Sequence, residues 1–289
     1  MPELPEVETL KRSLENKLNK KVIQDIQVSK MKILKNPFSL FQEVLIANEI
    51  KTLWRRGKSL LLELAEIRQD KKYLLIHLRM TGQLIWQSES QTEGGGHSLS
   101  ENDRHLPNRF THIILSLENR EKLFFNDQRQ FGVWQLFSEA EKTTYWQKWG
   151  IEPLTPEFTW QNFREKVKNK TSNLKTILLN QNIISGLGNI YADEVCFKSG
   201  IRPDRWGSSL KEVEWKRIYQ NIQEIISLAI SQKGTTFYSF VDGEGEKGNF
   251  ADFLQVYNRG KLDCLKCGKN LVKSRVAGRG TVFCPNCQK

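Results

Sequence analysis

The sequence predicts an α+β protein with an N-terminal helix, an antiparallel β-sandwich, a helical region and a C-terminal β-hairpin that holds a metal ion. Three observations predict this architecture. Short apolar runs separated by turn residues fill positions 20–140. Apolar side chains recur at helical spacing over 159–232. Four of the five cysteines lie within the last 26 residues, in two closely spaced pairs.

The size and charge of the chain limit what it can do. Its 289 residues suffice for one large domain or two ordinary ones. Lysine and arginine total 44 against 33 acidic residues, which gives a formal net charge of +11. This excess favours a polyanionic partner, nucleic acid before membrane, although a basic surface without a partner is the alternative. No apolar run approaches the ~20 residues of a membrane span and no signal segment opens the chain, so we expect a soluble, cytoplasmic protein, nucleoid-associated if bacterial.

The N-terminus carries an unusual candidate nucleophile. Removal of Met1 would make Pro2 the first residue, with a free secondary amine. Such amines titrate near ~8, well below lysine, so a larger fraction is unprotonated at neutral pH. Attack of a secondary amine on a sugar aldehyde carbon gives a cationic iminium, which is an electron sink. Glu3 and Glu6 follow as acid–base candidates. An ordinary exposed chain end before a helix is the alternative.

A helix is predicted over 3–19, where one face is apolar. Its apolar positions are Leu4, Val7, Leu10, Leu14 and Leu18. The positive end of its dipole would further disfavour protonation of the Pro2 amine. Strands are predicted at 22–28, 51–56, 59–64, 73–78, 111–117, 122–126 and 133–137. Residues 87–109 are rich in Ser, Glu, Gln and Gly and predict a long mobile surface loop.

The second half of the chain changes to a helical period after a proline-containing linker at 150–156. Helices are predicted at 159–168, 173–182, 189–199 and 210–232. The second and third are joined by a glycine-containing turn whose N–H groups could hold a phosphate, with Asn189 as helix cap. An ordinary helical hairpin is the alternative. The glycine-rich segment 234–250 could fold over a ligand or serve as a flexible connection.

The cysteine spacing predicts a zinc site. Cys264 and Cys267 form one C-x-x-C pair, and Cys284 and Cys287 form the other after sixteen residues. Paired thiolates at this spacing suit a tetrahedral, structural zinc ion. Disulfides are the alternative, which the clustering and the absence of a signal segment disfavour. The residues between the pairs predict a hairpin with a basic tip around Arg279. The fifth cysteine, Cys196, lies in an apolar helical context and is predicted to be a core residue.

Several motifs, taken in order, resemble the formamidopyrimidine-DNA glycosylase family over nearly the whole chain. They are Met1 to Thr9, Arg55-Arg56-Gly57-Lys58, His77 to Gly82, Asp127-x-Arg129-x-Phe131-Gly132, Gly186-x-Gly188-Asn189 through Glu194, Gln255-Val256-Tyr257 and the terminal cysteine hairpin. The resemblance implies an N-terminal β-sandwich domain at 1–149, a helix-two-turn-helix domain at 150–250 and a zinc finger at 251–289. It places DNA in the cleft between them.

The resemblance also implies a reaction on DNA that contains oxidised purines such as 8-oxoguanine and formamidopyrimidines. The damaged nucleotide is extruded from the duplex. Pro2 then attacks the sugar carbon and expels the base, while Glu3 supplies or takes the proton as the sugar ring opens. Elimination cuts first the 3′ side and then the 5′ side of the abasic site. Lys58 matches the lysine that contacts the lesion phosphate and donates a proton, and Arg279 matches a residue with a late elimination role.

The remaining family residues are DNA contacts. Met80, Arg129 and Phe131 match the side chains that fill the space left by the extruded base, with apolar wedges and an arginine for the opposite cytosine. Positions matched to DNA-phosphate contacts are Lys170, Asn189 and Arg279. Glu6 and Tyr257 are carried over as further DNA contacts. Residues 235–250 match the loop that closes on the extruded base.

The chain departs from the family pattern at three places. Arg109-Phe110 replaces a Lys-His pair near His112, so a histidine contact with DNA is expected to be missing. Gln130 occupies a position that is often basic, and the 87–109 loop is longer than usual. Two other readings stay open: an endonuclease VIII-like glycosylase for oxidised pyrimidines, and a non-catalytic damaged-DNA-binding module. In each, the partner is duplex DNA and the protein is expected to be a monomer.

Overall fold

The fold is α+β, as predicted, with antiparallel sheets, helices and a C-terminal two-stranded hairpin. The structure is a computed structural model. It describes residues 1–66, 71–97, 105–235, 240–241 and 248–289. The chain divides into two compact units. The first comprises Met1–Trp146 with Gln232–Asn249, and the second comprises Gln147–Ser231 with Phe250–Lys289.

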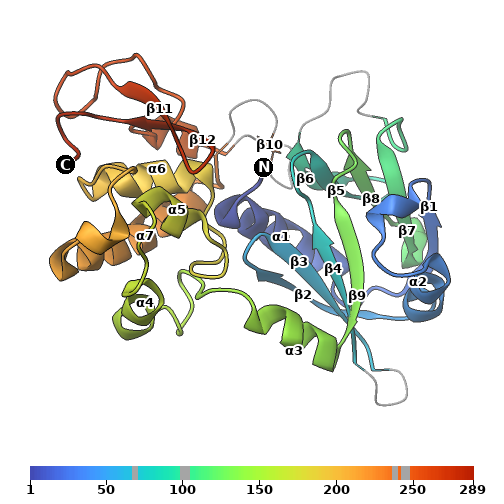
Figure 1. Cartoon of the computed structure of the whole chain (residues 1–289). Helices are drawn as coiled ribbons and strands as arrows, with labels where there is room; N and C mark the ends of the chain where they lie inside the picture. The colour runs from blue at the N-terminus through green and yellow to red at the C-terminus, as the bar shows by residue number, and fades with distance from the viewer. Residues whose placement is uncertain (67–70, 98–104, 236–239, 242–247) are drawn as a thin grey trace. The chain divides into compact units, whose positions relative to one another are not determined.

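The first unit contains two antiparallel sheets and the N-terminal helix (Figure 1). One sheet has the strand order β1-β7-β8-β5-β6-β10 and the other has the order β2-β3-β4-β9. The helices are α1 (Leu4–Leu18), α2 (Phe38–Leu45) and α3 (Glu139–Gln147). The strands are β1 (Ile23–Val28), β2 (Ile50–Arg56), β3 (Ser59–Leu64), β4 (Lys72–His77), β5 (Gly82–Gln87), β6 (Thr92–His97), β7 (Thr111–Leu117), β8 (Lys122–Asp127), β9 (Val133–Ser138) and β10 (Phe240–Val241).

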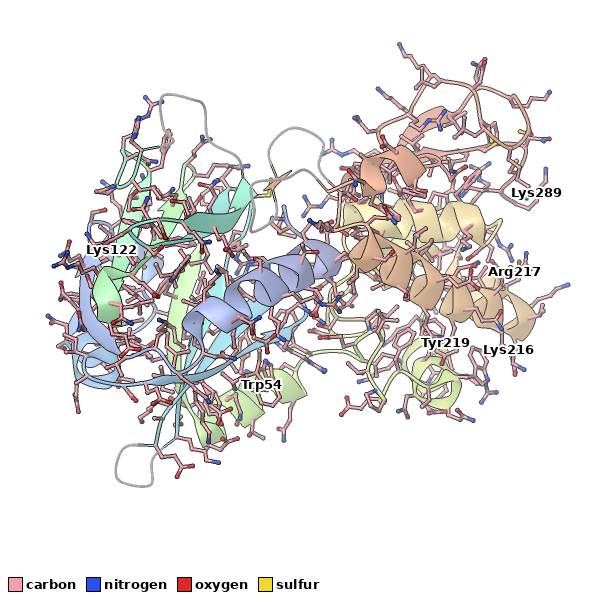
Figure 2. The ribbon with its side chains drawn as sticks, turned by 180° about the vertical axis from the view of Figure 1, so that it is seen from behind. Trp54, Lys122, Lys216, Arg217, Tyr219 and Lys289 are labelled. Atoms are coloured by element: carbon pink, nitrogen blue, oxygen red, sulfur yellow. The ribbon has the colours of Figure 1, made fainter. Side chains whose placement is uncertain are left out.

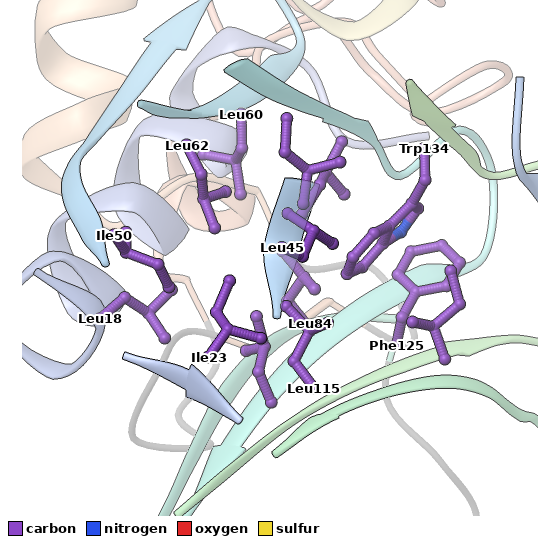
Figure 3. Packing of buried hydrophobic residues seen from close by; sticks show 14 of the residues in the cluster. Leu18, Ile23, Leu45, Ile50, Leu60, Leu62, Leu84, Leu115, Phe125 and Trp134 are labelled. Carbon is purple, nitrogen blue, oxygen red and sulfur yellow. The ribbon is translucent and has the colours of Figure 1, made fainter. Parts of the chain in front are cut away.

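The core of the first unit forms because the inward faces of both sheets and the apolar stripe of α1 are leucine-, isoleucine- and valine-rich (Figure 3). Leu10, Leu14 and Leu18 of α1 are fully buried in this cluster. Trp134 of β9 packs edge-on against Phe125 of β8, with ring centroids 5.7 Å apart. Of the candidate site residues, Lys58, Met80, Arg129 and Phe131 lie in turns that connect strands of this core.

The expected loop at 87–109 is partly wrong. Residues Thr92–His97 form β6, which pairs with β5 in antiparallel register. The reason lies in close packing at Gly94, where a Cβ atom would lie 2.5 Å from the Cα atom of Ile85. Glycine is therefore required there for the strand to approach its neighbour, and its presence does not mark a loop. Residues 98–104 of this segment lie outside the described residues.

The second unit contains the four predicted helices and the terminal hairpin. Its elements are α4 (Trp160–Val167), α5 (Leu174–Leu179), α6 (Asn189–Lys198), α7 (Glu212–Ser231), β11 (Val272–Val276) and β12 (Arg279–Phe283). Aromatic rings join α4 to α7: Tyr219 stacks on Phe158 at 5.1 Å between centroids and lies 5.6 Å from Phe163. Figure 2 labels Tyr219 and Lys216 of α7, and the Lys216 ammonium lies 5.6 Å from the Trp160 ring centroid of α4. Cys196 of α6 is fully buried, as predicted.

No helix among the described residues is both long and apolar enough to cross a membrane.

Candidate active site and metal centre

The first turn of α1 fixes the N-terminal residues. Glu3 is the N-cap residue and forms a capping box with Glu6, and its own N–H donates to Oε2 of Glu6 at 2.7 Å. Both carboxylates are buried, whereas Met1 is 48% exposed and Pro2 is half-buried. The capping box satisfies N–H groups that the first helical turn leaves open. It therefore holds Pro2 directly ahead of a buried carboxylate.

Glu6 also anchors a second chain segment. Its Oε1 accepts a hydrogen bond from the backbone N–H of Thr235 at 2.8 Å. Gly234 has φ +80°, and a Cβ there would lie 2.9 Å from the same Oε1. Thr235 bridges to Asn249 at the other end of the 235–250 segment. Both oxygens of Glu6 thus accept backbone N–H groups. The carboxylate therefore holds the backbone at Glu3 and at Thr235 in place. The expected closing loop itself lies mostly outside the described residues.

The turn between β2 and β3 carries the candidate lysine. Lys58 is only 6% exposed and follows Gly57, whose φ of +56° makes the tight turn. Arg55 Nε donates to Glu8 Oε2 of α1 at 2.7 Å. Burial alone would raise the pKa of Glu8, but the hydrogen bonds and positive charges of Arg55 and Arg12 outweigh it and lower that pKa. This ion pair ties the Lys58 turn to the helix that begins at Glu3.

His77 lies at the end of β4 opposite Ser59, the residue after Lys58. Burial, with the positive charges of Arg79 and Lys58, lowers the pKa of His77 to about 3. The ring is therefore neutral at physiological pH. Nδ1 accepts the backbone N–H of Arg79 at 3.0 Å, which leaves the proton on Nε2 as a donor. The sequence motif included His77 but gave it no role; its position after a buried strand beside a turn lysine was the available signal.

Met80 lies in the turn between β4 and β5, and Arg129 and Phe131 lie in the turn between β8 and β9, so both turns connect one sheet to the other. Met80 is 41% exposed and Phe131 is 52% exposed. The Arg129 guanidinium lies 4.7 Å from the Phe131 ring centroid. The two turns are joined through Thr81: its hydroxyl donates to Asp127 Oδ1 and accepts the Arg129 N–H at 3.0 Å. The structure thus brings all three predicted residues together, with two apolar side chains exposed.

Asp127 holds this arrangement from below the surface. Its side chain is fully buried, and Oδ2 accepts the N–H of Gly132 at 2.7 Å. Oδ1 accepts the N–H of Arg129 at 3.2 Å. His112, which follows the departure from the family pattern at Arg109-Phe110, is buried with Nε2 2.9 Å from the Asp127 carbonyl oxygen. Burial lowers the pKa of His112, so a neutral ring supports the turn.

In the second unit, the predicted cap at Asn189 is wrong. The N-cap of α6 is Gly188, and Asn189 is the first helical residue. The extended backbone at Gly188 ends the turn one residue earlier than expected. The amide nitrogen of Asn189 instead donates to the Gly280 carbonyl of β12 at 3.1 Å, and its Oδ1 has no hydrogen-bond partner among the described residues. Lys170 lies exposed between α4 and α5.

A pocket of about 320 Å³ lies at the start of α6. It is lined by Asn189, Asp193, Tyr257, Asn258, Lys273, Ser274, Gly280, Thr281 and Val282. Two of the predicted DNA contacts, Asn189 and Tyr257, therefore share one pocket. Lys273 was not predicted; it lies on β11 opposite Val282, and the basic run that begins with it was the available signal.

The four predicted metal ligands come together. The Sγ atoms of Cys264, Cys267, Cys284 and Cys287 all lie within 4.8 Å of one another. Gly268, at φ +72°, closes the first cysteine turn by donating its N–H to the Cys264 carbonyl at 2.9 Å. Four thiolates at this separation fit one tetrahedral zinc ion, which would cross-link the two turns. Arg279 begins β12, directly after the Ala277-Gly278 turn at the tip of the hairpin, and is exposed.

This combination of a two-sheet unit, a helical unit and a four-cysteine hairpin is the architecture of a class of DNA glycosylases. The formamidopyrimidine-DNA glycosylase N-terminal domain matches residues 1–134, and the helix-two-turn-helix (H2TH) domain of the same enzymes matches 149–240. The zinc finger found in these enzymes and in IleRS matches 263–289. The chain therefore belongs to the formamidopyrimidine-DNA glycosylase family and carries its zinc finger.

Relatives agree over the full length. The chain is 40% identical to a formamidopyrimidine-DNA glycosylase of Carboxydothermus hydrogenoformans, covering all of both chains. It is 38% identical to that of Pelotomaculum thermopropionicum, covering all of this chain and 99% of the relative. Among solved structures, the Lactococcus lactis enzyme in complex with DNA containing N7-benzyl-Fapy-dG has a TM-score of 0.86 at 33% identity, with both chains fully covered.

Proposed function

We propose that this protein is a bifunctional DNA glycosylase and abasic-site lyase that excises oxidised purines from duplex DNA in base excision repair. The observation that carries the proposal is the N-terminus: Pro2 precedes a buried Glu3 that the α1 capping box holds in place. Structures of the Lactococcus lactis relative contain Fapy-dG or abasic-site DNA, which supports a damaged-DNA substrate here. Substrates in this proposal are 8-oxoguanine and formamidopyrimidines.

The reaction begins after Met1 is removed. The Pro2 nitrogen forms a bond to C1′ of the sugar, and the glycosidic bond breaks with its electrons on the departing base. The sugar ring opens as O4′ takes a proton, for which Glu3 is the adjacent acid–base group. The product is an iminium between Pro2 and the open sugar.

Strand cleavage follows from the iminium. The positive nitrogen acidifies the C2′–H bond, so loss of that proton expels the 3′ phosphate. A second elimination expels the 5′ phosphate, and hydrolysis releases Pro2. Lys58, buried beside His77, serves as a phosphate contact and proton donor. Arg279 acts in the late elimination. These steps leave a one-nucleotide gap.

Other residues hold the DNA. Met80 and Phe131 enter the space left by the extruded base, and Arg129 bonds the base opposite, because these exposed side chains lie together on joined turns. Lys170, Asn189 and Tyr257 contact phosphates, a role for which the pocket shared by Asn189 and Tyr257 is suited. Glu6 assists through the N-terminal turn. The protein acts as a monomer, and residues 1–149, 150–250 and 251–289 serve as its three functional parts.

A glycosylase for oxidised pyrimidines is the second candidate. One solved structure of the Lactococcus lactis relative is a complex with DNA that contains an oxidised pyrimidine, which supports considering this lesion class here. A non-catalytic module is the third candidate, and it would bind damaged DNA without forming the iminium.

Borohydride trapping distinguishes the three. We expect covalent cross-linking to duplex DNA with 8-oxoguanine opposite cytosine, and weaker cross-linking to an oxidised-pyrimidine duplex run in parallel. Selective acetylation of the Pro2 amine should abolish the cross-link while binding to the duplex persists, because the acetylated nitrogen has no free electron pair for attack. Pro2→Gly is a weaker test, since a glycine α-amine can substitute in part.

Pro156→Gly, in the linker, is the matched control and should trap normally. Cross-linking that survives acetylation would contradict the role of Pro2. Equal or stronger trapping on oxidised pyrimidine would favour the second candidate, and binding without any cross-link would favour the third.

A further inference from the structure

The pocket at the start of α6 is assembled from three chain segments. Asn189 comes from α6, Tyr257 and Asn258 come from a turn before the cysteine segment, and Lys273 and Gly280 come from the hairpin. A pocket built this way requires something to hold the three segments in register. Two consecutive acidic residues of α6, Asp193 and Glu194, contact the other two segments. Both lie in the Gly186 to Glu194 motif, but the sequence alone predicts no role for them.

Asp193 binds the hairpin through a buried ion pair. Its side chain is 1% exposed and Lys175 of α5 is fully buried, with Lys175 Nζ 2.6 Å from Asp193 Oδ1. The same ammonium donates to the Gly280 carbonyl at 3.1 Å and to the Thr281 hydroxyl at 2.7 Å. Its three protons are thus matched by three acceptors. Oδ2 of Asp193 accepts the Val282 N–H at 3.2 Å. The pair joins α5 and α6 to β12 directly after Arg279.

Glu194 binds the turn on the other side of the pocket. Its side chain is 3% exposed, and it accepts three consecutive backbone N–H groups. Oε2 accepts that of Gln255 at 2.9 Å, while Oε1 accepts those of Val256 at 3.0 Å and Tyr257 at 2.8 Å. Burial raises the pKa of Glu194, and these N–H groups oppose the rise. The backbone of Tyr257 is therefore fixed to α6 by a single carboxylate.

The spacing along α6 makes this arrangement possible. Asn189 and Asp193 are four residues apart and lie on the same helical face, and Glu194 lies next to them. Both carboxylates are occupied by donors from the protein, and the charge of Asp193 is compensated by Lys175. Neither group is therefore poised to bind a cation, and neither presents an uncompensated carboxylate to a phosphate in the pocket.

We propose that Asp193 and Glu194 are positioning residues, which hold β12 and the 255–257 turn in register with Asn189 so that the three segments contact DNA phosphates together. Lys175 is the partner through which Asp193 acts. This inference rests on the proposed function for its ligand, duplex DNA, but the register itself is a property of the free protein.

The test separates positioning from stability. In the double variant Lys175→Met/Asp193→Leu, an apolar pair of similar volume replaces the ion pair, a change that folded proteins commonly tolerate. We expect it to fold and to retain one zinc ion per chain. Its affinity for an uncleavable abasic-analogue duplex should fall by about tenfold or more, with a shallower salt dependence, because fewer phosphates are contacted. The single-turnover rate of iminium formation at saturating DNA, which precedes the elimination step assigned to Arg279, should change by less than about threefold, since no group at Pro2 is touched.

Glu194→Gln is the second variant. The NH₂ group of its amide would face backbone N–H groups of 255–257, so at least one of these hydrogen bonds is lost. Glu224→Gln, an exposed residue of α7, is the matched control. Amide hydrogen exchange in the free protein should quicken at 255–257 in Glu194→Gln and at 280–283 in the double variant, and at neither in the control.

The outcomes distinguish the two proposals. Failure of the unaltered protein to bind the duplex would count against the proposed function and leave the exchange measurement valid. Unchanged exchange and affinity in folded, zinc-loaded variants would overturn the positioning role. A double variant that fails to fold would assign the ion pair to stability alone. That outcome would also overturn the positioning role of Asp193.

Discussion

Buried carboxylates hold loops in both units, but what supports those carboxylates differs. In the first unit, Glu6 and Asp127 accept backbone N–H groups and belong to elements that contribute side chains to the large apolar cluster (Figure 3). In the second, Asp193 and Glu194 do the same for the hairpin and its neighbouring turn. There the apolar cluster around the hairpin is small, and it includes two zinc-binding cysteines, Cys264 and Cys284.

The difference shows which interactions keep the sheets of the first unit and the hairpin of the second unit ordered. Four of the five residues of β11 are exposed, and β11 pairs with β12 alone. A two-stranded ladder of this kind is marginal in water without further support. In the first unit, by contrast, strands within the two sheets have neighbours on both sides. We therefore expect the N-terminal candidate site to depend on hydrophobic burial, and the order of the hairpin that carries Arg279 to depend mainly on the metal ion.

Zinc removal should have the largest effect and should break the second unit alone. Metal binding supplies folding free energy on the order of 10 kcal/mol to small zinc domains. We expect chelation to remove amide-exchange protection from 272–283 and to abolish duplex binding, while β3 and β4 keep their protection. Hydrogen exchange with mass spectrometry, read segment by segment, measures both. Re-addition of zinc should restore both.

Cysteine variants provide the matched comparison. Cys284→Ala removes a ligand and should reproduce chelation. Cys196→Ala alters a buried cysteine that is not part of the four-cysteine cluster and should retain zinc and binding. Protection of 272–283 that persists in the zinc-free protein would show that the hairpin is ordered by its protein contacts, and the contrast between the units would disappear.

Asp127→Asn should have an intermediate effect in the first unit. Asp127 now accepts hydrogen bonds from backbone N–H groups and a hydroxyl. The NH₂ group of Asn would face one of these donors and leave it without an acceptor. An unsatisfied buried group costs about 1–3 kcal/mol. The core should hold the sheets, so the expected loss is one of stability and local order at 128–132. Urea denaturation gives the free energy of unfolding, and amide exchange at Arg129 and Phe131 gives the local effect.

Asp25→Asn is the control in the same unit, because that carboxylate accepts only from the exposed Gln27 side chain among the described residues. It should change the free energy of unfolding by less than about 0.5 kcal/mol. A global collapse of the sheets in Asp127→Asn would mean that this carboxylate, and not the apolar cluster, supports the turn.

Strands and helices were predictable where one periodic signal dominated. Residues 59–64 and 73–78 are nearly continuous apolar runs and became β3 and β4, and the cysteine spacing alone predicted the metal centre. β6 was missed because its glycines look like a loop, although Gly94 is there for close packing against Ile85. Helices α2 and α3 were also not predicted, since each is short and depends on packing with the sheets.

The supporting contacts of the candidate site were less predictable than the site itself. Pro2, Glu3 and the cysteines are readable because their chemistry is tied to residue type and spacing. The burial of Lys175, a residue type that is usually exposed, depends on acceptors more than 100 positions away in the chain. Such partners meet only through the tertiary fold, so no local pattern predicts them.

Near neutral pH, the smallest expected effect is a pH dependence confined to the first unit. The pKa of His77 is lowered from 6.5 to about 3, so the unfolded chain binds the proton first as pH falls. The contribution of His77 to the free energy of unfolding is therefore complete above pH 6.5 and decreases toward pH 3, by roughly 1 kcal/mol at pH 6 and roughly 2 kcal/mol at pH 5.

His77→Gln should remove this slope in urea denaturation, whereas His105→Gln, at an exposed position, should leave it unchanged. Because His77 lies on β4 and pairs with Ser59 of β3, the added exchange at low pH should appear in those strands and not in α6. The same slope in His77→Gln would mean that another group of the first unit takes up the proton.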